Sequence, residues 1–134
     1  MMNYILLYLA TVPVFFAVDM LWLGVIAKGF YRAQMQGLIA DQFVWWAAIL
    51  FYALFILGII YFAVLPALAQ HSWMKALMLG ALFGFFTYMT YDLTNLATLK
   101  NWPLLLTFVD TLLGTVLSAT VATLSYLIGT RIFG

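Results

Sequence analysis

The hydrophobic positions of the chain fall into four long runs, at residues 3–27, 43–66, 73–99 and 103–128. Each run reaches the length of about 20 residues that an α-helix needs to cross the hydrocarbon core of a bilayer. Transmembrane β-strands are shorter and alternate between apolar and polar positions, which these runs do not. The pattern therefore predicts an all-α membrane protein, with four transmembrane helices in an antiparallel bundle and residues 1–134 as a single integral membrane domain.

The segments between the runs indicate how the helices connect. Residues 67–72 and 100–102 are so short that the helices on either side of each must be antiparallel neighbours. The longest connection, residues 28–42, carries three apolar side chains spaced by three or four positions: Tyr31, Met35 and Leu38. This spacing predicts a short interfacial helix between helices 1 and 2.

Small residues recur every four positions on the last two predicted helices. They are Ala76, Gly80 and Gly84 on the third helix and Gly114, Ser118 and Ala122 on the fourth. Small side chains at this spacing let helices approach closely, so these faces predict helix contacts. The second helix is rich in aromatic residues and has no charged residue, and we expect it to face lipid more than the other three.

Composition agrees with the lipid bilayer as the main partner, since 68% of residues are hydrophobic and 7% are charged. A soluble domain is about half apolar and about a quarter charged. The chain has no cysteine, and His71 is its only histidine, which excludes thiolate chemistry, iron–sulfur clusters and bis-histidine haem. We expect no cofactor and no metal site. The net charge of +1 gives no indication of nucleic acid as a partner.

The candidate chemistry lies in three aspartates inside the predicted helices. Asp19 lies eight residues before the end of the first helix, Asp92 seven before the end of the third, and Asp110 seven after the start of the fourth. Because the helices alternate in direction, the three carboxyls share a depth of roughly 10–12 Å from one membrane face. An unpaired carboxylate there costs at least about 2.5–3.5 kcal/mol, so we expect the three to face inward.

The sequence therefore predicts a polar pocket that opens toward the side of the first and third loops. The expected lining is Asp19, Trp22, Tyr88, Asp92, Asn95 and Asp110, with Lys28 and Lys100 at the mouth. In a structural interpretation, the acids only hold helices together by hydrogen bonds. In a functional interpretation, they form a site, because ionisable residues inside membranes commonly mark ligand, ion or proton pathways.

Three functions are compatible with such a pocket. The first is the binding or transport of a small ligand, a cation or a proton, with a homodimer as one form of assembly. The second is a membrane enzyme acting on a lipid or an isoprenoid, in which two aspartates do general acid–base work. The third is a structural or accessory subunit of a membrane complex. Binding or transport ranks first, and whether the protein is an enzyme stays open.

The same residues carry a resemblance to a known family. The segments are residues 19–24 (DMLWLG), Phe30-Tyr31, residues 91–100 (YDLTNLATLK), Trp102-Pro103, Asp110 and Gly114. In this order they resemble a bacterial family of predicted membrane proteins catalogued as domain of unknown function 2177, although Leu113 stands where that pattern favours tryptophan. The resemblance spans nearly the whole chain and implies a small multi-pass protein of the bacterial inner (cytoplasmic) membrane. It implies no activity.

Overall fold

The computed structural model describes residues 2–26, 29–38 and 44–134, and every regular element in these residues is helical. In chain order the elements are α1 (Met2–Leu21), the π-helical η1 (Trp22–Ile26), α2 (Phe30–Gln34), α3 (Trp45–Ile59), the π-helical η2 (Ile60–Val64), α4 (Leu65–Ala69), α5 (Trp73–Thr98) and α6 (Leu104–Phe133). Four helical stretches of this part of the chain are long and apolar enough to span a membrane: Met2–Gly24, Trp45–Ala69, Trp73–Thr98 and Leu104–Phe133. The four predicted transmembrane helices are thus confirmed, as is the short helix between the first two.

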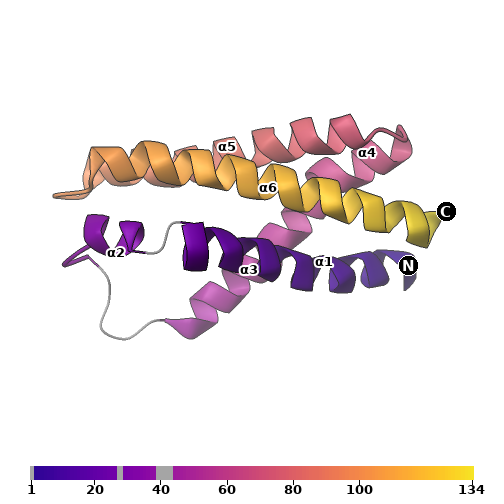
Figure 1. Ribbon diagram of the computed structural model, residues 1–134, viewed down its shortest axis with the longest axis horizontal. Coiled ribbons are helices and arrows are strands. Elements are labelled where there is room, and N and C mark those ends of the chain that lie inside the picture. The colour runs from indigo at the N-terminus through magenta and orange to yellow at the C-terminus, as the bar shows by residue number, and fades with distance from the viewer. Residues whose placement is uncertain (1, 27–28, 39–43) are drawn as a thin grey trace.

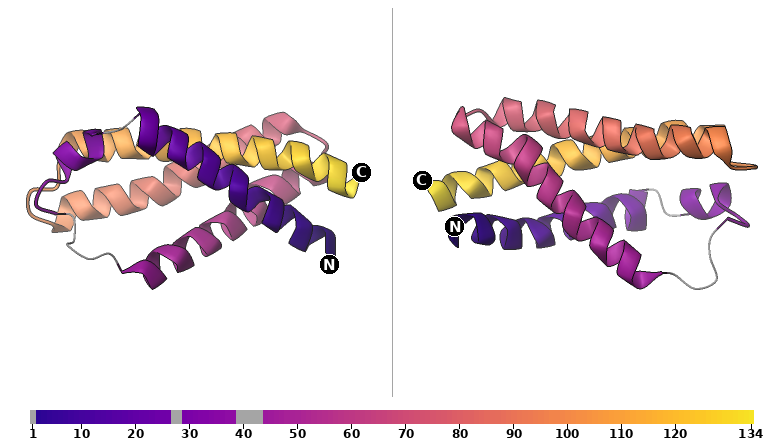
Figure 2. Two further views of the ribbon diagram at one scale, coloured as in Figure 1. Left: turned by 60° about the horizontal axis from the view of Figure 1, so that its bottom comes forward. Right: turned by 180° about the vertical axis from the view of Figure 1, so that it is seen from behind.

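Three of the four spans run roughly alongside one another, and the second is inclined to them. Figures 1 and 2 show α5 and α6 side by side, with α1 along α6. The second span, made of α3, η2 and α4, crosses the others at a steeper angle. Its α4 end packs against α5, while the start of α3 stands away from α5 and α6. The short α2 lies beside α6 at the end of the bundle where α3 diverges.

Helices α5 and α6 touch through their small residues. A Cβ atom added at Gly80 would lie 2.6 Å from Cβ of Ala122, and one at Gly84 would overlap the carbonyl oxygen of Gly114 and lie 2.6 Å from Cβ of Ser118. Carbon atoms in van der Waals contact are about 3.5–4.0 Å apart, so there is no room here for a larger residue. The predicted close contacts through small residues are confirmed.

The expectation that the second helix faces lipid more than the others is wrong. In its most apolar window 33% of residues are buried, compared with 22% in the first and third spans and 44% in the fourth. The first turns of α3 are exposed, but a continuous stripe farther along faces the bundle: Phe55, Ile56, Ile59, Ile60, Ala63, Val64 and Ala67. The steep crossing brings this later half of the span against the other helices, which aromatic content alone does not reveal.

Candidate functional site

Three buried aspartates lie toward the end of the bundle where α3 diverges. Asp19 is near the end of α1, Asp92 is in the last third of α5, and Asp110 is in the second turn of α6. Their exposed fractions are 6%, 0% and 9%, respectively. A buried carboxylate is costly unless it accepts hydrogen bonds or is paired with a cation. The groups around each carboxyl therefore decide what the site can do.

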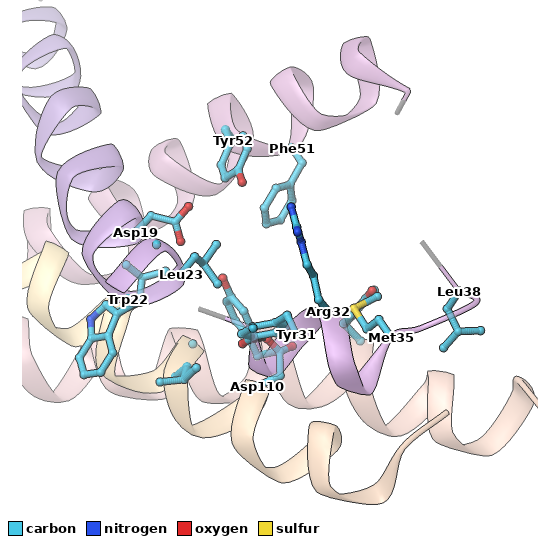
Figure 3. A pocket seen from close by; sticks show the side chains of 17 residues that line it. Asp19, Trp22, Leu23, Tyr31, Arg32, Met35, Leu38, Phe51, Tyr52 and Asp110 are labelled. Atoms are coloured by element: carbon cyan, nitrogen blue, oxygen red, sulfur yellow. Dashed lines mark hydrogen bonds between the residues drawn. The ribbon is translucent and has the colours of Figure 1, made fainter. Parts of the chain in front are cut away.

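A half-open cavity of about 930 Å³ lies between these helices. We call it the aspartate–tyrosine cavity. Its polar and aromatic lining comprises Asp19 and Trp22, Tyr31 and Arg32 from α2, Phe51 and Tyr52 from α3, Tyr88 and Tyr91 from α5, and Asp110 from α6. Figure 3 shows Asp19 on one side of this space, with Asp110 beside Tyr31 of α2 on another.

Four of the six predicted pocket residues line this cavity: Asp19, Trp22, Tyr88 and Asp110. Asp92 and Asn95 are not part of the wall. The rotation of α5 about its own axis turns Tyr88 and Tyr91 toward the cavity and Asp92 toward α6, where the hydroxyl of Thr111 donates to Asp92 Oδ2 over 3.4 Å. Helical spacing gives the relative directions of these side chains, but not this rotation.

Neither Asn95 nor Lys100 belongs to the cavity wall. Asn95 is half-buried and lies one turn beyond Tyr91, toward the end of α5. Lys100 is exposed and does not line the cavity, and Lys28 lies outside the described residues. The basic side chain that does line the cavity in the described part of the chain is Arg32, on α2.

Asp92 is buried behind the cavity wall with an incomplete set of partners. Its Oδ1 atom has no hydrogen-bond donor among the described residues. The Asp92 carboxyl also interacts with that of Asp110. The two carboxyls are therefore neighbours at the contact between α5 and α6.

Asp110 is held by a residue that sequence reasoning did not include in the site. The hydroxyl of Tyr31 on α2 donates a hydrogen bond of 2.6 Å to Asp110 Oδ1. Burial is the largest cause, and this hydrogen bond the next, of a pKa of Tyr31 above its usual value. The phenol therefore keeps its proton and remains a donor. Met35 and Leu38 line the cavity as well, and the apolar side chains of the first loop thus face the bundle.

Asp19 differs from Asp92 and Asp110 in having no hydrogen-bond donor among the described residues. The hydrogen bonds to aspartate carboxyls among the described residues come from Tyr31 and Thr111, and neither reaches Asp19. Figure 3 shows the Asp19 carboxylate and the Tyr52 hydroxyl turned toward the same space inside the cavity. A carboxylate that is buried, unpaired and directed into a cavity is an open acceptor for a ligand.

The position of Tyr88 depends on the glycine opposite it. A Cβ atom added at Gly114 would overlap the ring of Tyr88, so this ring packs directly on the backbone of α6. Its other neighbour is Phe55, whose ring centroid is 5.9 Å away in an edge-on arrangement. Gly114 therefore positions an aromatic wall of the cavity in addition to bringing α5 and α6 together.

The charges around the cavity are of both signs but unpaired. Among residues 2–26, 29–38 and 44–134, no ion pair joins a basic side chain to an aspartate. Figure 3 shows the side chain of Arg32 extending from α2 toward the ring of Phe51. The described residues also contain no group of three or more histidine, cysteine, aspartate or glutamate side chains that could hold a metal ion.

The fold and the site define a multi-pass helical membrane protein with a polar cavity at one end of the bundle. The family model described as "Predicted membrane protein (DUF2177)" matches residues 4–127, so the chain belongs to this family. The resemblance seen in the sequence is thereby confirmed. No curated protein and no solved structure matches the chain.

Proposed function

We propose that this protein binds a small ligand carrying an amine, in its ammonium form, inside the aspartate–tyrosine cavity. The proposal rests above all on Asp19, a carboxylate that is 94% buried, lacks a donor among the described residues and faces a cavity of about 930 Å³. We further propose that it works in the inner membrane of a bacterium, as the family resemblance implies.

Without a ligand, the buried Asp19 carboxylate has no counter-charge among the described residues. An unpaired carboxylate within a membrane span costs about 2.5–3.5 kcal/mol on insertion scales. An ammonium group supplies both the opposite charge and hydrogen-bond donors, and charge-assisted hydrogen bonds are about twice as strong as neutral ones. The ligand thus replaces the partner that the described residues do not give Asp19.

The walls of the cavity favour an organic cation over a bare metal ion. Trp22, Tyr52 and Tyr88 line it together with Phe51. Aromatic faces attract ammonium groups by about 0.5–2 kcal/mol, and this attraction is greatest where water is excluded. Hard metal ions instead need about six or more oxygen ligands, which an aromatic wall does not offer.

The test is the binding of benzylamine to the purified protein in an uncharged maltoside detergent, measured by calorimetry. Benzyl alcohol is the uncharged ligand of matching shape. We expect benzylamine to bind at least tenfold more tightly than benzyl alcohol, and Asp19→Asn to remove this preference, because one charge-assisted hydrogen bond is worth about 1.5–3 kcal/mol. Equal binding of the two ligands, or an unchanged preference in Asp19→Asn, would refute the proposal.

A pair of tyrosine variants separates the contribution of a hydroxyl in the cavity from the general effect of removing a hydroxyl. Tyr52 lines the cavity, whereas Tyr61 is exposed on η2 and does not. We expect Tyr52→Phe to change benzylamine affinity and Tyr61→Phe to leave it unchanged. An equal change of benzylamine affinity in both variants would indicate that the effect of the Tyr52 hydroxyl does not arise in the cavity.

A membrane enzyme acting on a lipid is the second candidate, and the Tyr31–Asp110 hydrogen bond is the observation that favours it. A phenol bonded to a carboxyl can pass a proton to or from a substrate at that position. Mass spectrometry of lipids from a deletion strain tests this candidate. An unchanged lipid profile would dismiss it.

A further inference from the structure

A second cavity, of about 380 Å³, opens beside the first between α3 and α5. We call it the side cavity. It shares Phe51, Tyr88, Tyr91 and Asp110 with the aspartate–tyrosine cavity and adds Phe55 and Thr87. The two spaces are therefore adjacent, with Asp110 and three aromatic rings as their common wall.

We propose that the ligand is a zwitterionic lipid headgroup, whose ammonium pairs with Asp19, whose phosphate pairs with Arg32, and whose alkyl chain leaves through the side cavity. This inference rests on the proposed function, because it names the class of amine that the same cavity takes. Such a headgroup supplies a partner to Asp19 and to Arg32, the two charged side chains of the cavity wall that have none among the described residues.

The side cavity suits an alkyl chain because aromatic rings make up most of its wall. Its polar groups are the Asp110 carboxyl and the hydroxyls of Thr87, Tyr88 and Tyr91. Phe51 and Phe55 supply aromatic rings from α3. The hydroxyl of Thr87 donates to the carbonyl oxygens of Phe83 and Gly84 at 2.8 and 3.2 Å, so its polar group is satisfied within α5. The Thr87 hydroxyl therefore needs no hydrogen bond from a ligand.

The side cavity also leads outward from the bundle. Phe51 is 47% exposed and Tyr91 is 51% exposed, whereas Phe55 is 6% exposed. The wall thus runs from a buried ring to two rings on the surface of a membrane span. Because both exposed rings belong to membrane spans, this end of the side cavity faces the surrounding acyl chains. A chain leaving this way exchanges protein contacts for lipid contacts without meeting water.

The order of charges along this route matches the order of groups in a headgroup. Asp19 lies in the aspartate–tyrosine cavity, and Arg32 reaches toward Phe51, which belongs to both cavities (Figure 3). We therefore assign the ammonium of the headgroup to Asp19 and its phosphate to Arg32, the basic side chain that lines the same cavity. Guanidinium groups bind phosphate through two parallel hydrogen bonds, and this geometry favours phosphate over a neutral linker.

The test compares three competitors against labelled benzylamine in the maltoside-solubilised protein. They are lysophosphatidylethanolamine with a twelve-carbon chain, the alkylamine of the same chain length, and glycerophosphoethanolamine, which has the headgroup without a chain. We expect the lysolipid to compete about tenfold better than either of the other two, since each of those lacks one of its contacts. A lysolipid no better than the alkylamine would overturn the phosphate assignment, and one no better than glycerophosphoethanolamine would overturn the side cavity.

Matched variants locate the two contacts. Arg32→Gln should abolish the advantage of the lysolipid over the alkylamine, while Arg131→Gln, at the far end of α6, should keep it. Thr87→Trp should abolish its advantage over glycerophosphoethanolamine, while Thr90→Trp, on the exposed face of α5, should keep it. If either control variant behaves like its partner, the corresponding contact is assigned wrongly.

Crosslinking of the wild-type protein covers the case in which a variant does not fold. A lysolipid with a photoreactive group in the half of the chain next to the headgroup should label Phe55 or Thr87, and labelling of α2 instead would overturn the route. The two proposals also fail differently. Benzylamine binding that depends on Asp19, without a lysolipid advantage, would leave the proposed function intact and remove only the lipid. Absence of benzylamine binding would remove the ammonium site itself.

Discussion

The contact between α5 and α6 allows a sharp test of how little space separates the two helices. A methyl group at Gly84 would overlap the carbonyl oxygen of Gly114 and press on the side chain of Ser118. Overpacking costs about 1–3 kcal/mol, and a backbone obstacle that cannot rotate away belongs at the upper end of this range. Alanine stabilises a helix by about 1 kcal/mol relative to glycine, which offsets part of this cost. We therefore expect Gly84→Ala to lower the free energy of unfolding by about 2 kcal/mol.

Gly24 provides the matched control, because a Cβ atom there would have no neighbour within 4 Å. Gly24→Ala keeps only the favourable helix preference and should be as stable as the wild type or up to about 1 kcal/mol more stable. The assay is equilibrium unfolding in mixed dodecyl sulfate and maltoside micelles, followed by tryptophan fluorescence. If Gly84→Ala unfolds at the same dodecyl sulfate fraction as Gly24→Ala, the close approach of α5 and α6 is wrong.

Three further predictions concern individual hydroxyl groups. Tyr31→Phe removes the donor to Asp110 and should loosen α2, seen as faster amide hydrogen exchange in α2 with unchanged exchange in the middle of α6. Thr11→Val breaks the buried 2.7 Å contact between the Thr11 and Ser125 hydroxyls and should cost about 1–3 kcal/mol in the unfolding assay, with part of the loss recovered when Ser125→Ala is added. Ser118→Ala removes a buried hydroxyl that has no partner among the described residues, so it should be neutral or stabilising, and a loss above about 1 kcal/mol would show that this hydroxyl is bonded.

The features that follow from local spacing could be predicted from the sequence. The four spans follow from run length, and the close contacts of Gly80 and Gly84 follow from their four-residue period. The burial of Asp19 and Asp110 follows from the cost of exposing a carboxylate to acyl chains, which leaves few other directions for these side chains. Each of these depends on one helix and its solvent.

The features that depend on how separate helices are turned and tilted could not be predicted. Asp92 faces α6 and not the cavity because of the rotation of α5, and no residue of α5 alone fixes that rotation. Tyr52 reaches the cavity because α3 crosses the bundle steeply, although it is far from the aspartates in sequence. The inward direction of Tyr31 had a weak signal, since a phenol in an apolar stripe can equally serve as a lipid anchor or as a donor to a buried acid.

The steep crossing of the second span links this protein to the thickness of its host membrane. A helix of 25 residues, such as Trp45–Ala69, is about 38 Å long, which exceeds a hydrocarbon core of about 30 Å. Tilting absorbs such an excess, and a thicker bilayer requires less of it. Longer acyl chains would therefore draw α3 upright toward α5 and narrow the gap between them, while shorter chains would widen it. Membrane thickness would thus bear on the inclination of the second span, and with it on the width of the side cavity between α3 and α5.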